Sequence, residues 1–239
     1  MAQIKANEAL VKALQTWNID HLYGIPGDSV DAVVDSLRTV RDQFKFYHVR
    51  HEEVASLAAA SYTKMTGKIG VALSIGGPGI VHLLNGMYDA KMDNVPQLII
   101  AGQTNSTLLG TKFFQETNIS KMVDDVAVYH HQIQKGDNVF EITNEAIRTA
   151  YEKKGVSVII CPNDLLTQKI KDTTNRAVDT TKPKPASPKF KSIKKAAKLI
   201  DKAKKPVMLI GLGTQHAKDE LREFIAVSYT HLTLPTSDL

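Results

Sequence analysis

Cysteine is nearly absent from this chain of 239 residues, in which the one thiol belongs to Cys161. A single cysteine excludes an internal disulfide and any metal site built from several thiolates. Because Cys161 follows an apolar stretch, we expect a buried structural thiol rather than a nucleophile. Long apolar runs are also missing, and the segment after Met1 lacks the apolar core of a secretory signal. The sequence therefore predicts a cytoplasmic location.

Acidic residues are scarce in one segment. Between Lys182 and Lys205 there are ten lysines and one acidic residue, Asp201, which gives +9 in a chain whose net charge is +5. The rest of the chain therefore carries −4. A solvated basic linker and helix face explains this charge. Because no recognised nucleic-acid motif occurs, and arginines do not alternate with aromatic residues along the segment, we expect no nucleic-acid partner.

Short apolar strands alternate with amphipathic helical patterns over residues 1–165. This alternation is typical of βαβ units with parallel strands and right-handed crossovers. It predicts an α/β fold with a doubly wound, six-stranded parallel sheet. The predicted strands are 20–24, 45–49, 69–74, 98–101, 126–130 and 156–160, and the predicted helices are 4–17, 30–40 (capped by Asp28 or Ser29), 52–66, 80–93 and 144–153.

The pattern changes after residue 170. Threonine, lysine and proline over 171–188 predict an extended linker. A second, Rossmann-like α/β unit then begins, with an apolar strand at 207–210 followed by a Gly-Leu-Gly-Thr turn. We therefore assign 1–170 to the first domain, 171–188 to the linker, 189–226 to the truncated start of a second domain and 227–239 to a foreign tail.

One helix start stands out. Glu52 begins a helical pattern that Gly67 ends, and a Gly-Gly-Pro-Gly turn, 76–79, follows the next strand. Ligands bind at the carboxyl edge of open parallel sheets, where both features belong. An acidic residue in a first helical turn is also favoured by the helix dipole alone, without any function. The stripe predicted to face the core is Val54, Leu57, Ala58, Ser61, Tyr62 and Met65.

Adjacent histidines also suggest a metal site, at His130 and His131. Neighbouring residues of a strand point to opposite faces, so a pair of this kind rarely shares an ion. We expect ordinary surface and partly buried histidines.

Several motifs together resemble the pyrimidine-binding domain of thiamine-diphosphate enzymes. They are Gly24-Ile25-Pro26-Gly27, His51-Glu52, Gly77-Pro78-Gly79, Gln103 and Phe114-Gln115-Glu116. The resemblance covers about residues 3–226. It is closest to the pyruvate oxidases and related pyruvate:quinone oxidoreductases, because Gly27-Asp28-Ser29 and the segment 82–86 follow their pattern better than that of the acetolactate synthases.

The resemblance implies roles for individual residues. Glu52 would hydrogen-bond the pyrimidine nitrogen of thiamine diphosphate and favour the imino tautomer that removes the thiazolium C2 proton. The implied catalytic residues are Glu52, His82, Phe114 and Gln115, and the implied cofactor contacts are Pro26, Gly27, Glu52, Ser74, Pro78 and His82, with Gly211 and Gly213 for the flavin. No metal ligand is assigned, because the nearest match to the family's magnesium motif, Gly136-Asp137-Asn138, lies in the wrong domain.

The same resemblance implies the N-terminal part of a pyruvate oxidase. The parent protein would use thiamine diphosphate, Mg²⁺ and FAD to convert pyruvate to acetate or acetyl phosphate and CO₂. Its partner would be a second subunit in a homodimer or homotetramer, with a peripheral membrane or quinone contact also compatible. The chain as given is expected to be inactive. Two alternatives stay open, an acetolactate synthase-like carboligase and a non-catalytic folded or dimerisation module.

Overall fold

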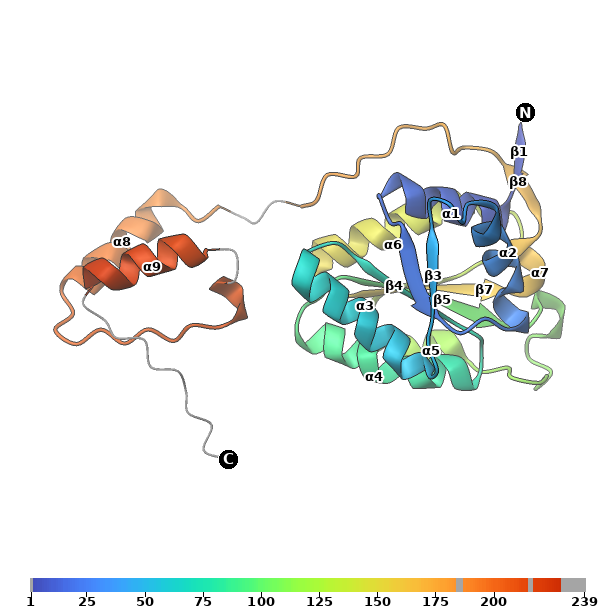
Figure 1. Ribbon diagram of the computed structural model, residues 1–239, viewed down its shortest axis with the longest axis horizontal. Coiled ribbons are helices and arrows are strands. Elements are labelled where there is room, and N and C mark those ends of the chain that lie inside the picture. The colour runs from blue at the N-terminus through green and yellow to red at the C-terminus, as the bar shows by residue number, and fades with distance from the viewer. Residues whose placement is uncertain (1, 184–186, 215–216, 229–239) are drawn as a thin grey trace. The chain divides into compact units, whose positions relative to one another are not determined.

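The computed structural model describes residues 2–183, 187–214 and 217–228. It divides the chain into two units, Met1–Pro183 and Lys184–Leu239 (Figure 1). The elements of the first unit are β1 (Gln3–Lys5), α1 (Ala6–Thr16), β2 (His21–Gly24), the 3₁₀ turn η1 (Asp28–Val30), α2 (Asp31–Thr39), β3 (Lys45–His48), α3 (Glu52–Thr66), β4 (Gly70–Ser74), α4 (Pro78–Met92), β5 (Gln97–Gln103), the 3₁₀ turn η2 (Ser106–Leu108), α5 (Ile119–Val123), β6 (Ala127–Gln132), α6 (Val139–Lys153), β7 (Val156–Pro162), α7 (Asn163–Leu166) and β8 (Lys169–Lys171).

Six of these strands form one parallel sheet in the order β3-β2-β4-β5-β7-β6. The register aligns Ile99 of β5 with Ala72 of β4 on one side and with Val158 of β7 on the other. This confirms the predicted α/β fold with a six-stranded parallel sheet.

The central strands are buried on both faces, as their sequences require. Every residue of β4, β5 and β7 is buried. Successive side chains of a strand point to opposite faces, so Leu98 and Ile100 enter one core while Ile99 and Ala101 enter the other. Cys161 belongs to the first core and is fully buried, and this burial raises the pKa of its thiol. The expected structural thiol is therefore confirmed.

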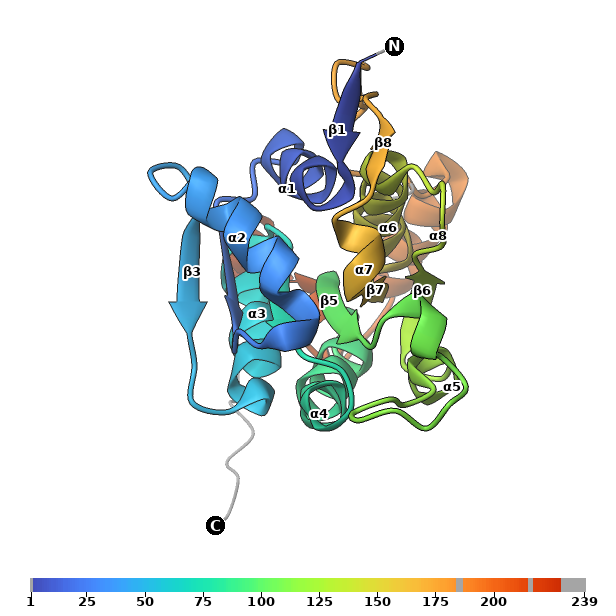
Figure 2. The same cartoon turned by 90° about the vertical axis from the view of Figure 1, so that its right-hand side faces the viewer.

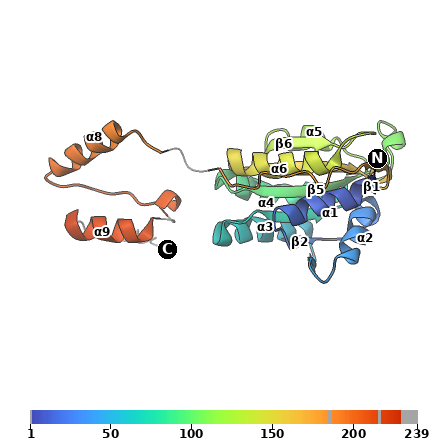
Figure 3. The ribbon, with the colours of Figure 1, turned by 90° about the horizontal axis from the view of Figure 1, so that it is seen from above.

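Helices cover both faces of the sheet (Figure 2). The core on one face is closed by α1, α2, α6 and α7, and α1 packs beside α6 there (Figure 3). The core on the other face is closed by α3, α4 and α5. Helices α3 and α4 lie close together at Gly86 of α4. A Cβ at this glycine would meet the backbone nitrogen of Leu57 at 2.6 Å.

The predicted buried stripe of α3 is wrong. The buried residues of this helix include Ala55, Ser56, Ala59, Ala60 and Thr63. Val54 is 49% exposed and Met65 is 86% exposed. The sequence pattern misled because α4 packs so closely that only small residues fit between the two helices, and the larger side chains lie on the outer face.

Other local predictions also need correction. Neither Asp28 nor Ser29 caps α2, because both lie in η1 and the N-cap is Val30 without a side-chain hydrogen bond. Helix α6 begins five residues before its predicted start, where the side chain of Asn138 accepts a hydrogen bond from the backbone of Glu141. The antiparallel pair β1–β8 and the helix α5 are too short to show a periodic pattern that could be recognised in the sequence.

Part of the predicted linker lies against the first unit. The backbone of Asp172 donates to Ala2, Val178 packs on the core beneath α1 and α6, and the Lys182 ammonium donates to the Gly67 carbonyl. Residues 172–183 thus form a strap over the first unit, which we call the 172–183 strap.

The second unit contains α8 (Phe190–Asp201), the 3₁₀ turn η3 (Leu212–Thr214) and α9 (Lys218–Ser228). The predicted strand at 207–210 is wrong, because these residues form no ladder, and Val207 and Leu209 are almost fully exposed. A lone strand has no partner for its backbone groups, and the described residues supply none. Helix α9 includes Val227 and Ser228, and residues 229–239 of the predicted foreign tail lie outside the described residues.

Within the described part of the chain, no helix is long and apolar enough to cross a membrane.

Candidate active site at the carboxyl edge of the sheet

The strand order changes direction between β2 and β4. The chain leaves β2 toward β3 on one side and returns past β2 to β4 on the other. Such a switch point leaves a crevice outside the carboxyl ends of the strands, where ligands of open α/β sheets bind. The segments that follow β2, β3, β4 and β5 all begin at this edge, and they contain the site residues predicted in the first unit except Ser74, which is the last residue of β4.

Glu52 lies in the first turn of α3 and is only 8% exposed. His51 precedes it in an extended conformation and gives the helix no side-chain cap. The first backbone N–H groups and the positive end of the helix dipole therefore favour a negative charge at this position. The Oε2 atom of Glu52 lies 2.9 Å from Nδ1 of His82 on α4. In the described residues, no hydrogen bond to its second oxygen, Oε1, occurs.

Histidines and a second carboxylate surround this pair. The rings of His51 and His82 are stacked with centroids 4.4 Å apart. Glu53 contacts Asn85, and its Oε2 lies 3.7 Å from Nδ1 of His51. Glu53 is therefore occupied by surface partners, whereas the partner of Glu52 is His82 on the neighbouring helix.

The same groups come near to the arrangement of a metal site. One ligand atom from each of His51, Glu52 and His82 lies within 4.8 Å of the other two. Ligands of tetrahedral zinc lie about 2 Å from the ion and so only a little over 3 Å from one another. The three side chains would have to move together to hold an ion, and the hydrogen bond between Glu52 and His82 explains their approach without one.

The glycine turn after β4 lies directly against the long polar loop. Gly77 has φ +61°, and a Cβ there would meet the backbone oxygen of Gln115 at 2.9 Å. Gly76 donates its N–H to Oγ of Ser29 at 3.1 Å. Glycine is required here because two stretches of backbone approach each other where a side chain would intervene. The turns after β2 and β4 and the loop after β5 are thereby brought together.

The remaining predicted cofactor contacts lie at different depths. Pro26 and Pro78 are exposed, and Pro78 occupies the first turn of α4. Gly27 is half-buried, close enough to Ile75 that a Cβ would meet that side chain at 2.6 Å. Ser74 is fully buried and donates its hydroxyl to the carbonyl of Ile75. Ser74 therefore supports the turn from below, and its side chain is not on the open surface of the crevice.

The loop from 104 to 118 holds Phe114 and Gln115 at this edge. Phe114 is 77% exposed, and Gln115 has φ +62°. A cavity of about 600 Å³ lies under the loop and is lined by Gln103, Leu109, Gly110, Lys112, Glu116, Thr117, Asn118, Ser120 and Gln132. The side chain of Phe114 is thus largely open to solvent, and Phe114 is not one of the residues that line this cavity.

Glu116 was not singled out as a site residue, yet it organises this loop. Its carboxylate accepts hydrogen bonds from the backbone of Gly110 at 2.5 Å and of Phe113 at 3.1 Å. The hydrogen bond from Gly110, with others from the loop backbone, holds the pKa of Glu116 below its ordinary value. In the sequence, only the position of Glu116 next to Phe114-Gln115 indicates that it belongs to the site.

The crevice suits a ring that carries a hydrogen-bond donor. Only Oε2 of Glu52 has a hydrogen-bond partner among the described residues, and Oε1 is not one of their buried unpaired side-chain oxygens, so Oε1 reaches solvent and is free to accept a hydrogen bond. A protonated ring nitrogen would satisfy Oε1. The neighbouring glycine turns are packed against Ile75, Gly102 and Gln115, so they hold the edge of the crevice together.

Gly211 and Gly213 belong to the second unit and lie at η3. A Cβ at either position would meet no atom within 4 Å in the described structure. Their predicted flavin contact thus stays a prediction.

Comparison with known proteins assigns the first unit to a family. Residues 4–122 match the family model for the thiamine pyrophosphate enzyme, N-terminal TPP binding domain. The chain is 46% identical over 237 residues, 98% of its length, to the "Putative thiamine pyrophosphate-containing protein YdaP" of Bacillus subtilis (strain 168). It is also 38% identical over 222 residues to a pyruvate oxidase of Lactiplantibacillus plantarum and 32% identical over 225 residues to an acetolactate synthase of Mycobacterium leprae, in each case over 92% of this chain.

The matched relatives are much longer than this chain. The alignments cover 41% of the Bacillus subtilis protein, 37% of the pyruvate oxidase and 36% of the acetolactate synthase. The chain therefore spans about two fifths of the length of these relatives.

Proposed function

The first unit of this chain belongs to the N-terminal, thiamine pyrophosphate-binding domains of the thiamine pyrophosphate enzymes, and from this membership we propose that it forms part of a pyruvate oxidase. In the proposed reaction, pyruvate is oxidatively decarboxylated to acetate or acetyl phosphate and CO₂. The observation that supports the proposal most strongly is Glu52, a nearly buried carboxylate in which one oxygen is bound to His82 and the other has no hydrogen-bond partner among the described residues.

Glu52 has the position that the chemistry needs. Thiamine diphosphate, when bound, supplies the electron sink that decarboxylation of a 2-oxo acid requires and that no side chain offers. The Oε1 atom of Glu52 would share a proton with the pyrimidine ring nitrogen. The low exposure of the carboxylate excludes water from that hydrogen bond and so strengthens it.

His82 and the glycine turns would position this group. The hydrogen bond from His82 to Oε2 would hold the carboxylate in place and leaves Oε1 free to accept a further hydrogen bond. Gly27 and Pro26 at the end of β2, with Pro78 at the start of α4, would form the walls of the pyrimidine site. Phe114 and Gln115 would approach the reacting centre from the polar loop.

A second subunit is part of the proposal. Helices α3 and α4 cover one core of the sheet, yet their outer surface keeps large apolar side chains in solvent. Val54, Met65, Val81, Tyr88 and Met92 are each between 39% and 86% exposed. Exposed apolar residues on two packed helices indicate a protein interface, here proposed to be a homodimer or homotetramer contact that also covers the crevice next to Glu52.

The diphosphate, the magnesium ion and the flavin would be held mainly outside the first unit. The sequence contains no match to the magnesium motif in the expected place, and Gly136-Asp137-Asn138 is committed to the start of α6 and its preceding turn. Asp137 is bound to His131 at 2.7 Å. We propose that Gly211 and Gly213 of the second unit contact the flavin.

Product analysis in the complete enzyme that carries this chain tests the proposed function. With pyruvate, thiamine diphosphate, Mg²⁺ and FAD, we expect CO₂ release and reduction of a supplied quinone or of oxygen, together with acetate or, when inorganic phosphate is supplied, acetyl phosphate. Loss of this activity in Glu52→Gln, with activity retained in Glu53→Gln, would support Glu52 as the working carboxylate. The absence of pyruvate-dependent CO₂ release from the cofactor-loaded enzyme would contradict the proposal.

An acetolactate synthase-like carboligase is the second candidate. The 32% identity to an acetolactate synthase favours keeping it. The same experiment separates the two functions, because a carboligase would convert two pyruvate molecules to acetolactate and one CO₂ without a net electron acceptor.

A further inference from the structure

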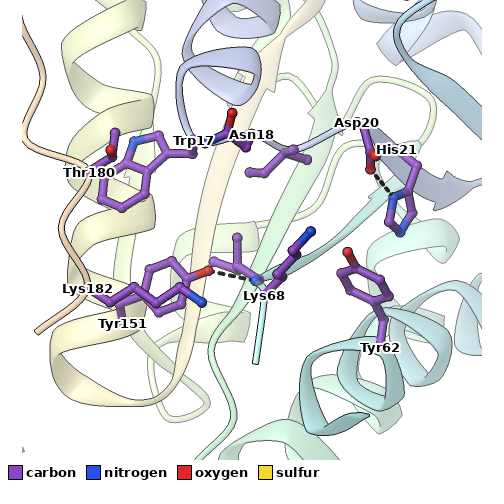
Figure 4. A pocket seen from close by; sticks show the side chains of 11 residues that line it. Trp17, Asn18, Asp20, His21, Tyr62, Lys68, Tyr151, Thr180 and Lys182 are labelled. Atoms are coloured by element: carbon purple, nitrogen blue, oxygen red, sulfur yellow. Dashed lines mark hydrogen bonds and ion pairs between the residues drawn. The ribbon is translucent and has the colours of Figure 1, made fainter. Parts of the chain in front are cut away.

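A second cavity lies at the opposite edge of the sheet from the candidate active site (Figure 4). It has a volume of about 150 Å³ and lies where β2 and β4 begin. Its lining residues are Trp17, Asn18, Ile19, Asp20, His21, Tyr62, Lys68, Ile69, Tyr151, Thr180 and Lys182. The last two belong to the 172–183 strap, which closes one side of the cavity.

Two lysines share this cavity without a compensating ion pair. Among the described residues, no carboxylate lies within 4.0 Å of either the Lys68 or the Lys182 ammonium. Lys182 donates to the Gly67 carbonyl at 2.6 Å and lies 5.2 Å from the centre of the Tyr151 ring. Burial, together with the nearby charge of Lys68, lowers the pKa of Lys182. The two cations therefore repel each other at the cavity, although both residues keep an exposed surface.

Two tyrosines, Tyr62 and Tyr151, add neutral hydrogen-bond donors to the lining of the cavity. The Tyr151 hydroxyl accepts a hydrogen bond from the backbone of Ile69 at 2.8 Å, so its own proton is available to a further acceptor. Burial raises the pKa of Tyr151 and keeps this hydroxyl protonated. Tyr62 places a second hydroxyl at the cavity, with its ring edge-on to His21. The indole N–H of Trp17 is already bound to Asn144, so Trp17 contributes an apolar wall.

Asp20 is the one carboxylate that lines the cavity, and it is committed elsewhere. It lies 2.6 Å from Nδ1 of His21, and its side chain is 71% exposed. This hydrogen bond is the main cause that lowers the pKa of Asp20, and the nearby charge of Lys68 also lowers it. The lining thus contains two lysines and one carboxylate, whose hydrogen bond is to His21.

We propose that this cavity is a binding site for a small oxyanion, a phosphate or a carboxylate group, held between Lys68 and Lys182 with hydrogen bonds from Tyr62 and Tyr151. A volume of about 150 Å³ corresponds to about five water molecules at about 30 Å³ each, and so to a ligand of four to six non-hydrogen atoms. The contact between the 172–183 strap and the Tyr151 ring uses only one lysine, Lys182. A second lysine at the same cavity favours an anion there, because a negative charge would offset the repulsion between the two ammonium groups.

Trp17 reports directly on this site, because it is the one tryptophan of the chain and stacks on Tyr151 at 5.9 Å between centroids. The experiment is a fluorescence titration of the 239-residue chain with inorganic phosphate and, separately, with acetate, at constant ionic strength set with chloride. A saturable change with either anion supports the site. Saturation by phosphate alone identifies a phosphate ligand, and saturation by acetate alone identifies a carboxylate.

Variants separate the site from general anion effects. Lys68→Gln and Tyr62→Phe remove one donor each, and each is expected to weaken binding, by about tenfold for the charged donor. Lys135→Gln removes an exposed lysine after β6, at the other edge of the sheet, and should leave binding unchanged. Circular dichroism confirms that the variants are folded. No saturable change with either anion, or equal weakening by Lys68→Gln and Lys135→Gln, would overturn the proposal.

Discussion

Two adjacent carboxylates begin α3, and their surroundings differ. Glu52 is nearly buried and bonded to His82, whereas the side chain of Glu53 is 38% exposed and contacts Asn85. The sequence pattern predicts that a helix begins at these acidic residues, and the family resemblance selects Glu52 as the functional one. The bond to His82 and the lack of a partner for Oε1 could not be predicted, because they depend on how α3 and α4 pack.

Gly77→Ala tests whether the glycine turn positions the loop. Glycine has φ +61° there, and a Cβ would meet the Gln115 backbone, so we expect a loss of about 1–3 kcal/mol in the free energy of unfolding. Gly110→Ala is the matched control, since it has φ +83° but no atom within 4 Å of the added Cβ. Denaturant unfolding of both variants decides. Equal losses would show that the contact with Gln115 adds nothing to the backbone strain.

Tyr129 gives a pH-dependent prediction. Burial first, and then nearby acids, raises its pKa from 10.0 to about 12. The unfolded chain therefore loses this proton at lower pH than the folded chain, so the stabilisation is complete below about pH 10 and is lost as the pH rises toward 12. Tyr129→Phe should unfold with a weaker dependence on pH in this window. Urea unfolding at several pH values measures the dependence, and an unchanged slope would contradict the assignment.

At the scale of elements, the close packing of α3 on α4 explains the main failure of the sequence pattern. Helical periodicity shows which residues share a face, but small residues such as Ala55, Ala59 and Ala60 carry little signal. Gly86 on the facing helix lets α3 approach, because a Cβ there would meet the backbone of Leu57 and the side chain of Ser56. The strands were easier to predict. Uninterrupted apolar segments such as 98–101 indicate strands that are buried on both faces, whichever helices cover those faces.

Gly86→Ala tests this packing. Alanine within a helix is normally more favourable than glycine, by about 0.5–1 kcal/mol. Here the added Cβ would lie 2.6 Å from the backbone nitrogen of Leu57, so we expect destabilisation of about 1–3 kcal/mol instead. Ser61→Ala, on the exposed face of α3, serves as control and should stay within about 0.5 kcal/mol of the parent. A thermal or denaturant melt that shows stabilisation by Gly86→Ala would contradict the predicted contact.

The proposed subunit interface is tested on the same two helices. Val81→Glu and Met92→Glu each place a charge on the exposed apolar surface of α4. If this surface is an interface, the variants should shift the protein from dimer to monomer in analytical ultracentrifugation. Lys12→Glu on α1 changes charge away from this surface and should leave the mass unchanged. A parent protein that stays monomeric at high concentration would remove the basis for the interface.

For the whole molecule, the sequence predicted the six-stranded parallel sheet and placed the domain change near residue 171. The structure extends the first unit to Pro183, because Val178 and Lys182 of the strap contact α1 and α6 and the end of α3. Proline and lysine composition could not show that these residues lie on the surface of the first unit. The structure of the second unit differs more from its prediction. Within the described residues, the predicted strand at 207–210 has no neighbouring strand with which to pair.

Truncation distinguishes the two boundaries. A fragment of residues 1–183 keeps the strap and should unfold cooperatively with a melting temperature close to that of the 239-residue chain. A fragment of residues 1–170 loses the contacts of Thr173, Val178 and Lys182 and should melt at a lower temperature. Circular dichroism melts compare the three proteins. Equal melting temperatures for the two fragments would show that the strap contributes no stability.

The account depends most on Glu52 acting on the pyrimidine ring of thiamine diphosphate. The most direct measurement is the rate at which the C2 proton of the bound cofactor exchanges with deuterium, followed by NMR in the complete enzyme that carries this chain. We predict that Glu52→Gln slows this exchange by about 10²- to 10⁴-fold, the usual contribution of general acid–base catalysis, while Glu53→Gln changes it little. Exchange at the parent rate in Glu52→Gln, or equal slowing in both variants, would contradict the account.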